Sequence, residues 1–148
     1  MANSNGHHTS QPFSQIIECV KEFHDRFGIA NSDEINGALP EEVVRLRHRL
    51  MAEETEEYLE AALRHDTVEI ADALGDQLYI LCGTILSHGM QHILEDVFQE
   101  IQASNMSKLG GDGKPIYRED GKVMKGPGYF RPNIGAILEA HESQSSEA

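Results

Sequence analysis

The feature that most constrains this chain is a series of carboxylates inside an otherwise apolar helical stretch. Residues 68–89 read VEIADALGDQLYILCGTILSHG, and Glu69, Asp72 and Asp76 follow one another at spacings of three and four residues. In an α-helix this spacing places all three side chains along one face. Asp76 has leucines two residues away on both sides, a poor place for a carboxylate without a role.

A second acidic helix is predicted just before the first. Residues 51–60 read MAEETEEYLE, and Glu54 and Glu57 project from adjacent turns of one face, where like charges repel. The short HDT connection at residues 65–67 favours antiparallel packing, so the two acidic faces can meet. Converging carboxylates are strongly destabilising unless a cation neutralises them. Ligands that are all oxygen select Mg²⁺ or Mn²⁺ over zinc.

The competing interpretation of these acids is a solvated helix face, with Asp72 capping a helix or pairing with an arginine. For Glu56 and Glu60 the solvated face is the preferred interpretation, since surface glutamates are common. For Glu54, Glu57 and Asp76 we favour metal binding.

The remaining pattern predicts an all-α fold with four main helices and neither internal repeats nor βαβ alternation. The first is expected to begin near Pro12 and end at Gly28, and the second to begin near Pro40. Asp66 or Thr67 is expected to cap the third, which ends at Gly89, and the fourth starts at residue 92. Most of the buried side of the second helix is expected to come from Val43, Leu46, Leu50, Tyr58, Ala61 and Ala62.

Composition divides the chain into four segments. Residues 1–10 form a flexible leader, 11–109 the helical domain, 110–135 a Gly- and Pro-rich segment, and 136–148 a solvated tail. Six of the 12 Lys and Arg residues lie between positions 108 and 131, and because five of these fall within residues 110–135 we call that segment the basic flap. The flap contains a candidate hairpin that turns at Asp120-Gly121. Its lysines could meet phosphate charge opposite the acidic helices, although no Walker-type phosphate loop is present.

The net charge of −13 argues against a nucleic-acid backbone as partner. No apolar run approaches the ~20 residues of a membrane span, and the first residues lack the features of a signal peptide, which together predict a cytoplasmic protein.

Apolar residues on more than one face of a short helical chain predict a homo-oligomer, either a dimer or a dimer-of-dimers tetramer.

These motifs together resemble those of the MazG-type nucleotide pyrophosphohydrolases, particularly the short single-module form of phages and bacteria. They belong to the all-α NTP pyrophosphatase superfamily, which also includes phosphoribosyl-ATP pyrophosphohydrolases and dimeric dUTPases. The likeness spans about residues 13–134 and rests on VKEFHDRFG, on LRHRLMAEETEEYLEAALRHDTVEIADALGDQLYILCGT, and on SNMSKL followed by DGKPIYREDGKVMKGPGYFRPN. The family pattern E-x-x-E is matched by Glu54 and Glu57. The following E-x-x-D is less regular. When the chain is aligned on LGD, Asp76 is the aspartate of the pattern, but the position three residues earlier, where a glutamate is expected, is Ala73. Asp72 or Glu69 must then replace the missing glutamate.

The resemblance implies hydrolysis of a nucleoside triphosphate between its α- and β-phosphates, with two or more Mg²⁺ ions per site and a metal-activated water as nucleophile. It implies catalytic roles for Glu53, which would take the proton or orient the water, and Glu54. The implied metal ligands are Glu54, Glu57, Glu69, Asp72 and Asp76.

The resemblance also implies a phosphate site and a base site. The phosphates would be met by Asn105, Lys108, Lys122, Lys125 and Tyr129, some of them from a neighbouring subunit. The base would be met by Phe23, His24 and Phe27, although by periodicity alone Phe23 and Phe27 are predicted core residues. The favoured substrate is dGTP or GTP.

Three alternatives stay open. The first is a dUTPase or dCTPase of the same superfamily. The second is phosphoribosyl-ATP hydrolysis, for which the ending GKVMKGPGYFRP is not the expected one. The third is a non-catalytic acidic helical interaction module, which would need no Mg²⁺ and would tolerate Glu54→Gln.

Overall fold

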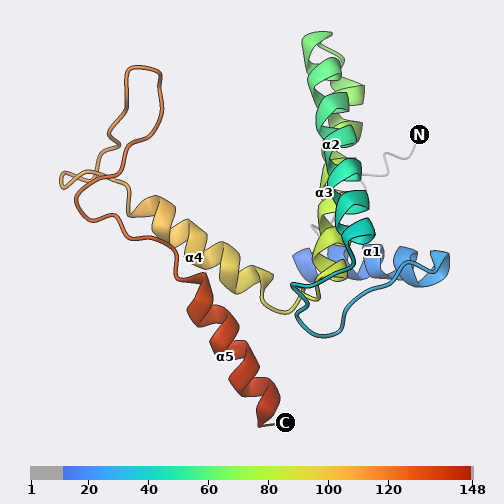
Figure 1. Ribbon diagram of the computed structural model, residues 1–148. Helices are drawn as coiled ribbons and strands as arrows, with labels where there is room; N and C mark the ends of the chain where they lie inside the picture. The colour runs from blue at the N-terminus through green and yellow to red at the C-terminus, as the bar shows by residue number, and fades with distance from the viewer. Residues whose placement is uncertain (1–11, 148) are drawn as a thin grey trace, which may run out of the picture. The chain divides into compact units, whose positions relative to one another are not determined.

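The computed structural model describes residues 12–147, which form two compact units that divide between Gln91 and His92 (Figure 1). The chain contains five helices in the described range: α1 (Phe13–Phe27), α2 (Glu41–Leu63), α3 (Thr67–Ser87), α4 (Leu94–Met106) and α5 (Ile134–Ser146). The same range has no β-strand, only an isolated antiparallel bridge. The predicted all-α class is confirmed, and none of the helices in this range is long and apolar enough to cross a bilayer.

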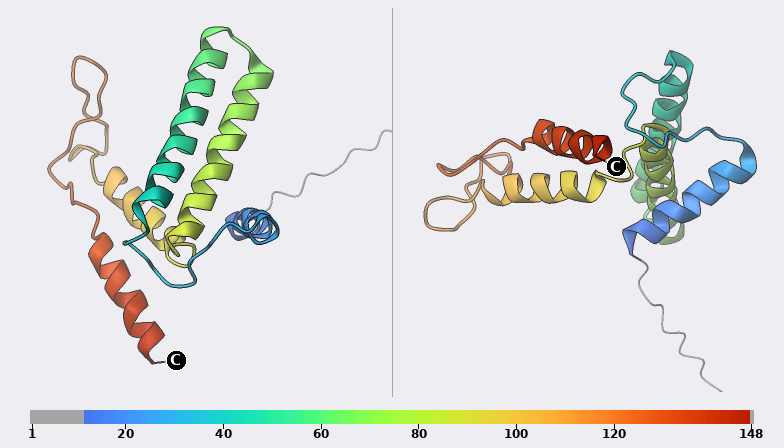
Figure 2. Two further views of the ribbon diagram at one scale, coloured as in Figure 1. Left: turned by 45° about the vertical axis from the view of Figure 1, so that its right-hand side comes forward. Right: turned by 90° about the horizontal axis from the view of Figure 1, so that it is seen from below.

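In the first unit, α2 and α3 form an antiparallel pair and α1 packs on α3 near the end away from the α2–α3 turn (Figure 2). The predicted turn chemistry is present. Asp66 caps α3, its side chain accepting a hydrogen bond from the backbone N–H of Glu69 at 3.2 Å. Gly28 ends α1 in the left-handed conformation, with φ of 69°.

The line of contact between α2 and α3 differs from the predicted one. The two buried residues of α2 are Arg47 and Ala61, and Glu54 between them is half-buried. Leu46 and Tyr58, both predicted to be buried, are 41% and 40% exposed. The side of α2 that faces α3 therefore carries Arg47, Glu54 and Ala61, each seven residues or about two helical turns from the next, and the first two are polar.

In the second unit, the segment after α4 folds back onto the end of that helix. The Ser104 hydroxyl donates to the carbonyl of Phe130 at 2.8 Å, and the Gly126 N–H donates to the carbonyl of Lys108 at 2.9 Å. Between these anchors the predicted hairpin turns at Gly121, whose φ is 83°. Its register is set by the N–H of Arg118 donating to the Lys122 carbonyl at 2.8 Å.

The predicted number of helices was wrong, because α5 occupies positions where a solvated tail was expected from residue 136. Asn133 caps this helix by accepting a hydrogen bond from the N–H of Ala136 at 3.2 Å. No residue of α5 is fully buried, and the helix packs on α4. The predicted flexible leader, residues 1–10, lies outside the described residues.

Candidate active site

The predicted catalytic and metal-binding acids all lie on α2 and α3, and we call them the carboxylate set: Glu53, Glu54, Glu57, Glu69, Asp72 and Asp76. Glu54 is its most enclosed member. Its Oε2 atom is buried without a hydrogen-bond partner, and its main-chain carbonyl accepts from Nε2 of Gln77 on α3 at 3.2 Å. An unpartnered buried carboxylate oxygen is costly, so this atom is available to bind a group from outside the chain.

The electrostatics of Glu54 show which carboxylates stand near it. Burial is the largest cause that raises its pKa above the ordinary value. Neighbouring negative charge raises that pKa further, in the order Glu57, Asp76, Glu53 and Asp72. Two of these groups belong to α2 and two to α3, so the antiparallel pair brings the two acidic motifs together as the sequence predicted.

A cleft of about 320 Å³ lies between α2 and α3 at Glu57, and neither Glu54 nor Asp76 lines it. Its acidic lining includes Glu57, Glu69 and Asp72, so both candidates for the irregular position of the second motif border the same space. The basic group on its rim is Arg64, which is 3.9 Å from Glu60.

The carboxylate set is gathered but not closed around one point. Within residues 12–147, no three histidine, cysteine, aspartate or glutamate side chains are positioned to hold one metal ion together. Asp72 and Asp76 are exposed, and Glu53 reaches toward Arg49 at 3.8 Å. The donor chemistry still fits a hard divalent cation, since the candidate donors are carboxylate oxygens and one of them is buried and unpartnered.

The predicted phosphate-binding residues lie in the second unit. Lys108 donates to Oδ1 of Asn105 at 2.8 Å beyond the end of α4, and Nζ of Lys125 lies 4.6 Å from the centre of the Tyr129 ring. Lys122 is exposed in the hairpin, where its N–H donates to Asp120 at 3.2 Å. Cationic and hydrogen-bonding side chains are thus grouped between the end of α4 and the hairpin.

The predicted base-binding residues of α1 separate into two exposed rings and one buried one. Phe23 and Phe27 stack at 4.3 Å between centroids, and Tyr79 of α3 meets Phe23 edge-on at 5.7 Å. Phe27 is 69% exposed and Phe23 is 37% exposed, so neither is the core residue that periodicity predicted. His24 is only 2% exposed.

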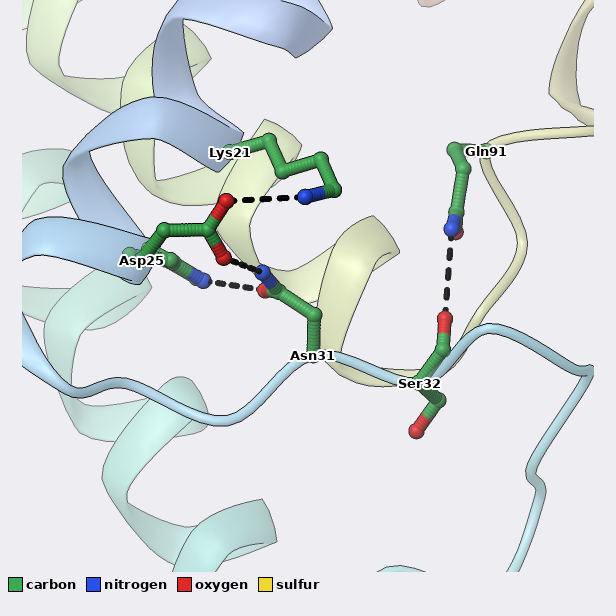
Figure 3. A network of polar contacts seen from close by, with 6 residues as sticks. Lys21, Asp25, Asn31, Ser32 and Gln91 are labelled. Carbon is green, nitrogen blue, oxygen red and sulfur yellow. Dashed lines mark hydrogen bonds and ion pairs between the residues drawn. The ribbon is translucent and has the colours of Figure 1, made fainter.

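A chain of polar contacts runs from Lys21 through Asp25 to Asn31 (Figure 3), and Asn31 in turn contacts His24. Lys21 binds Asp25 at 2.8 Å, and the Asn31 amide donates to Asp25 at 3.4 Å. The Asn31 oxygen therefore faces His24 and accepts from its Nδ1–H at 2.6 Å. Burial is the main cause that lowers the pKa of His24, and the positive charge of Arg47 lowers it further.

This lowered pKa predicts a loss of stability on acidification. Below pH ~6.5 the unfolded chain protonates His24 while the folded chain resists, so the free energy of unfolding should fall between pH 7 and pH 5.5. Urea unfolding at the two pH values measures this fall. His24→Gln should show a smaller fall, and an equal fall in both proteins would contradict the assignment.

Two polar residues of the contact between α2 and α3 were missed by the sequence analysis, Gln77 and Arg47. Gln77 is adjacent to Asp76 and faces α2. Arg47 could have been noticed because it precedes Glu54 by seven residues, the spacing of positions that share a helix contact.

Comparison with known proteins supplies the family. The sequence profile of the phosphoribosyl-ATP pyrophosphohydrolases matches residues 20–105, which include α2, α3 and the whole carboxylate set. Among 24 matching chains of solved structures is a candidate NTP pyrophosphohydrolase from Exiguobacterium sp. 255-15. It is 30% identical, the match covers 94% of this chain and 100% of that one, and the TM-score is 0.45. No curated protein matches the chain. The chain therefore belongs to the phosphoribosyl-ATP pyrophosphohydrolase family, within the all-α NTP pyrophosphohydrolase superfamily, and is a pyrophosphohydrolase.

Proposed function

We propose that this enzyme hydrolyses a nucleoside or deoxynucleoside triphosphate between the α- and β-phosphates, releasing the monophosphate and pyrophosphate. The observation that carries the proposal is the environment of Glu54. Its buried oxygen lacks a partner and its pKa is raised by burial and by carboxylates of two helices. A site that gathers negative charge in this way suits a polyphosphate substrate that arrives with divalent cations.

In this proposal Glu54, Glu57, Glu69, Asp72 and Asp76 hold Mg²⁺, with Mn²⁺ as a substitute and two or more ions per site. Bound Mg²⁺ would supply charge neutralisation at the phosphate oxygens and lower the pKa of a water molecule. Glu53 is given a different task in this proposal, and its long contact with Arg49, at 3.8 Å, leaves its carboxylate free for it. It orients the attacking water and accepts its proton.

The second unit would supply the cationic half of the site. Asn105, Lys108, Lys122, Lys125 and Tyr129 bind the phosphates, and the basic flap, residues 110–135, closes over them. The present contacts of Lys108 and Lys125 are with an amide and an aromatic ring, neither of which is an ion pair. Both ammonium groups can therefore exchange these contacts for phosphate oxygens without leaving a carboxylate unpaired.

We further propose a homo-oligomer, a dimer or tetramer, in which the flap of one subunit can serve the carboxylate set of another. Large apolar side chains at the turn between α2 and α3 are exposed, with Leu63 at 72% and Val68 at 75%. Exposed apolar area of this kind is typical of surfaces that bind another protein. Size-exclusion chromatography with light scattering measures the state directly.

For the base, we propose that Phe23 and Phe27 form a stacking platform, with His24 behind them. The paired rings offer an exposed π-face, and stacking on aromatic side chains contributes about 1–3 kcal/mol per base. Stacking accepts any base, so it does not select guanine. We place dGTP and GTP first because of the sequence resemblance alone.

The deciding experiment incubates the protein with Mg²⁺ and each of the eight common ribo- and deoxyribonucleoside triphosphates, and separately with phosphoribosyl-ATP, and identifies the products. Monophosphate with pyrophosphate identifies the bond that is cleaved, and the rates identify the base. Faster hydrolysis of dUTP or dCTP than of dGTP would favour the dUTPase or dCTPase alternative. Hydrolysis of phosphoribosyl-ATP alone would replace the proposed substrate, and no turnover of any substrate would favour the interaction module.

A further inference from the structure

Arg47 is a buried cation that the proposed reaction does not use. It is 6% exposed, and its Nε and Nη2 donate to Oγ1 of Thr84 at 3.1 Å and to the carbonyl of Ile80 at 2.7 Å. Among the described residues no ion pair includes Arg47. A buried charge with only neutral partners contributes little net stability, and an apolar residue of similar volume is often at least as stabilising. The presence of arginine here therefore calls for a reason other than stability.

The guanidinium of Arg47 occupies the space where a side chain at position 83 would lie. A Cβ placed on Gly83 of α3 would lie 2.5 Å from Nη2 of Arg47 and 2.8 Å from Nε2 of His24. Any side chain at position 83 would therefore displace both groups, and only glycine leaves room for the arginine to reach across to α3.

The neighbouring histidine is kept compatible with the cation. The proton of His24 is held on Nδ1 by Asn31, so the nitrogen that faces Gly83 and Arg47 carries a lone pair. Burial and the charge of Arg47 both lower the pKa of His24, which keeps the imidazole neutral. A neutral His24 does not repel the positive charge of Arg47, so the guanidinium keeps its position against Ile80 and Thr84.

That position is linked to the carboxylate set by helix geometry. Arg47 and Glu54 are seven residues apart on α2, two turns along one side of the helix. On α3, the partners of Arg47 are at positions 80 and 84, and Gln77, one turn earlier, binds the main chain of Glu54. Two cross-helix polar contacts thus fix how far α2 is displaced along α3, where a slip of one turn would move Glu54 by about 5.4 Å.

We propose that Arg47 is a positioning residue that holds α2 in register with α3, so that Glu54 stands opposite Asp76, with Gly83 providing the space it needs. Polar groups inside a helix–helix contact are known to specify register at some cost in stability. The proposal depends on the proposed function, because the register matters for activity only if the carboxylate set holds the metal.

The test compares two substitutions. Arg47→Met keeps most of the side-chain length and removes the N–H donors, whereas Arg47→Lys keeps the positive charge and removes the planar guanidinium that binds two partners at once. The matched control is Arg45→Met, since Arg45 lies on the same helix, is 76% exposed and pairs with the exposed Glu41. For each protein three quantities are measured: Mn²⁺ affinity by electron paramagnetic resonance, kcat and KM with nucleotide, and the thermal midpoint in metal-free buffer.

We expect Arg47→Met to weaken Mn²⁺ binding and lower kcat by about 10–100-fold, the effect typical of residues that orient metal ligands. KM should change little and the thermal midpoint should stay level or rise, which a merely structural role would not produce. Arg47→Lys should recover part of the loss, and Arg45→Met should match the wild type. If Arg47→Met does not fold, Gly83→Ala and Arg47→Lys carry the same comparison.

Wild-type Mn²⁺ affinity and kcat in Arg47→Met would overturn the positioning role. If Arg47→Met does not fold, wild-type values in both Gly83→Ala and Arg47→Lys would overturn it. A wild-type protein that binds no Mn²⁺, or a Glu54→Gln variant that binds it as tightly as wild type, would instead overturn the metal site itself. The two failures are therefore distinguishable.

Discussion

Replacing Glu54 with glutamine is expected to lower the rate of pyrophosphate release by about 1,000-fold, more than the 10–100-fold typical of groups behind the metal ligands. The change removes one negative oxygen from the centre of the carboxylate set while preserving shape and the main-chain contact with Gln77. Pyrophosphate released from the preferred nucleotide under saturating Mg²⁺ measures the loss.

The same substitution should not destabilise the fold. The folded-state pKa of Glu54 lies above its ordinary value, so above that pKa the ionised carboxylate opposes folding. Glutamine removes the charge, and the thermal midpoint at pH 7 in metal-free buffer should stay level or rise.

The matched control for this prediction is Glu56→Gln, an identical chemical change two residues away on an exposed part of α2. It should retain wild-type activity. Equal activity in the two variants would show that Glu54 has no special role, and a large drop in the thermal midpoint of Glu54→Gln would show that the carboxylate stabilises the fold.

Replacing Gly89 with alanine is expected to lower the free energy of unfolding by about 3 kcal/mol or more, the range of steric and strain effects at a special backbone position. Gly89 follows α3 with φ of 66° and is buried. An added Cβ would lie 2.0 Å from the carbonyl oxygen of Glu34, in the segment that joins α1 to α2. Because backbone atoms make this contact, no side-chain rotation can relieve it.

Gly28→Ala is the control for the backbone cost alone. Gly28 has nearly the same φ, 69°, but a Cβ added there would have nothing within 4 Å, so about 1–2 kcal/mol is expected from the left-handed conformation. Urea unfolding of both variants at one protein concentration measures the difference. Equal losses would contradict the close packing of residues 32–36 against the end of α3.

The carboxylate set illustrates how much of a site local pattern can predict. The spacing of Glu54 and Glu57 and of Glu69, Asp72 and Asp76 fixed which faces they occupy, because helical periodicity is a property of the backbone. The short connection at Asp66 then favoured the antiparallel pairing that brings these faces together. Which acids bind metal is still a prediction.

The line of contact between α2 and α3 could not be predicted in the same way. Hydrophobicity assigned Leu46 and Tyr58 to the buried side, yet Arg47 is buried and both of the others are partly exposed. The contact follows from the room at Gly83 and from hydrogen bonds to Ile80 and Thr84, partners more than 30 residues away in sequence. Such long-range complementarity leaves no periodic signal.

Local sequence was enough to establish the all-α class, the helix ends at Gly28 and Asp66, and the two acidic faces, since each depends on residues within a few turns of one another. The packed fold was needed to establish that Glu54 is enclosed, that His24 is buried while Phe23 and Phe27 are exposed, and that Arg47 joins α2 to α3. Burial and hydrogen bonding of these side chains depend on which distant helix lies opposite, and that is settled by packing rather than by local preference.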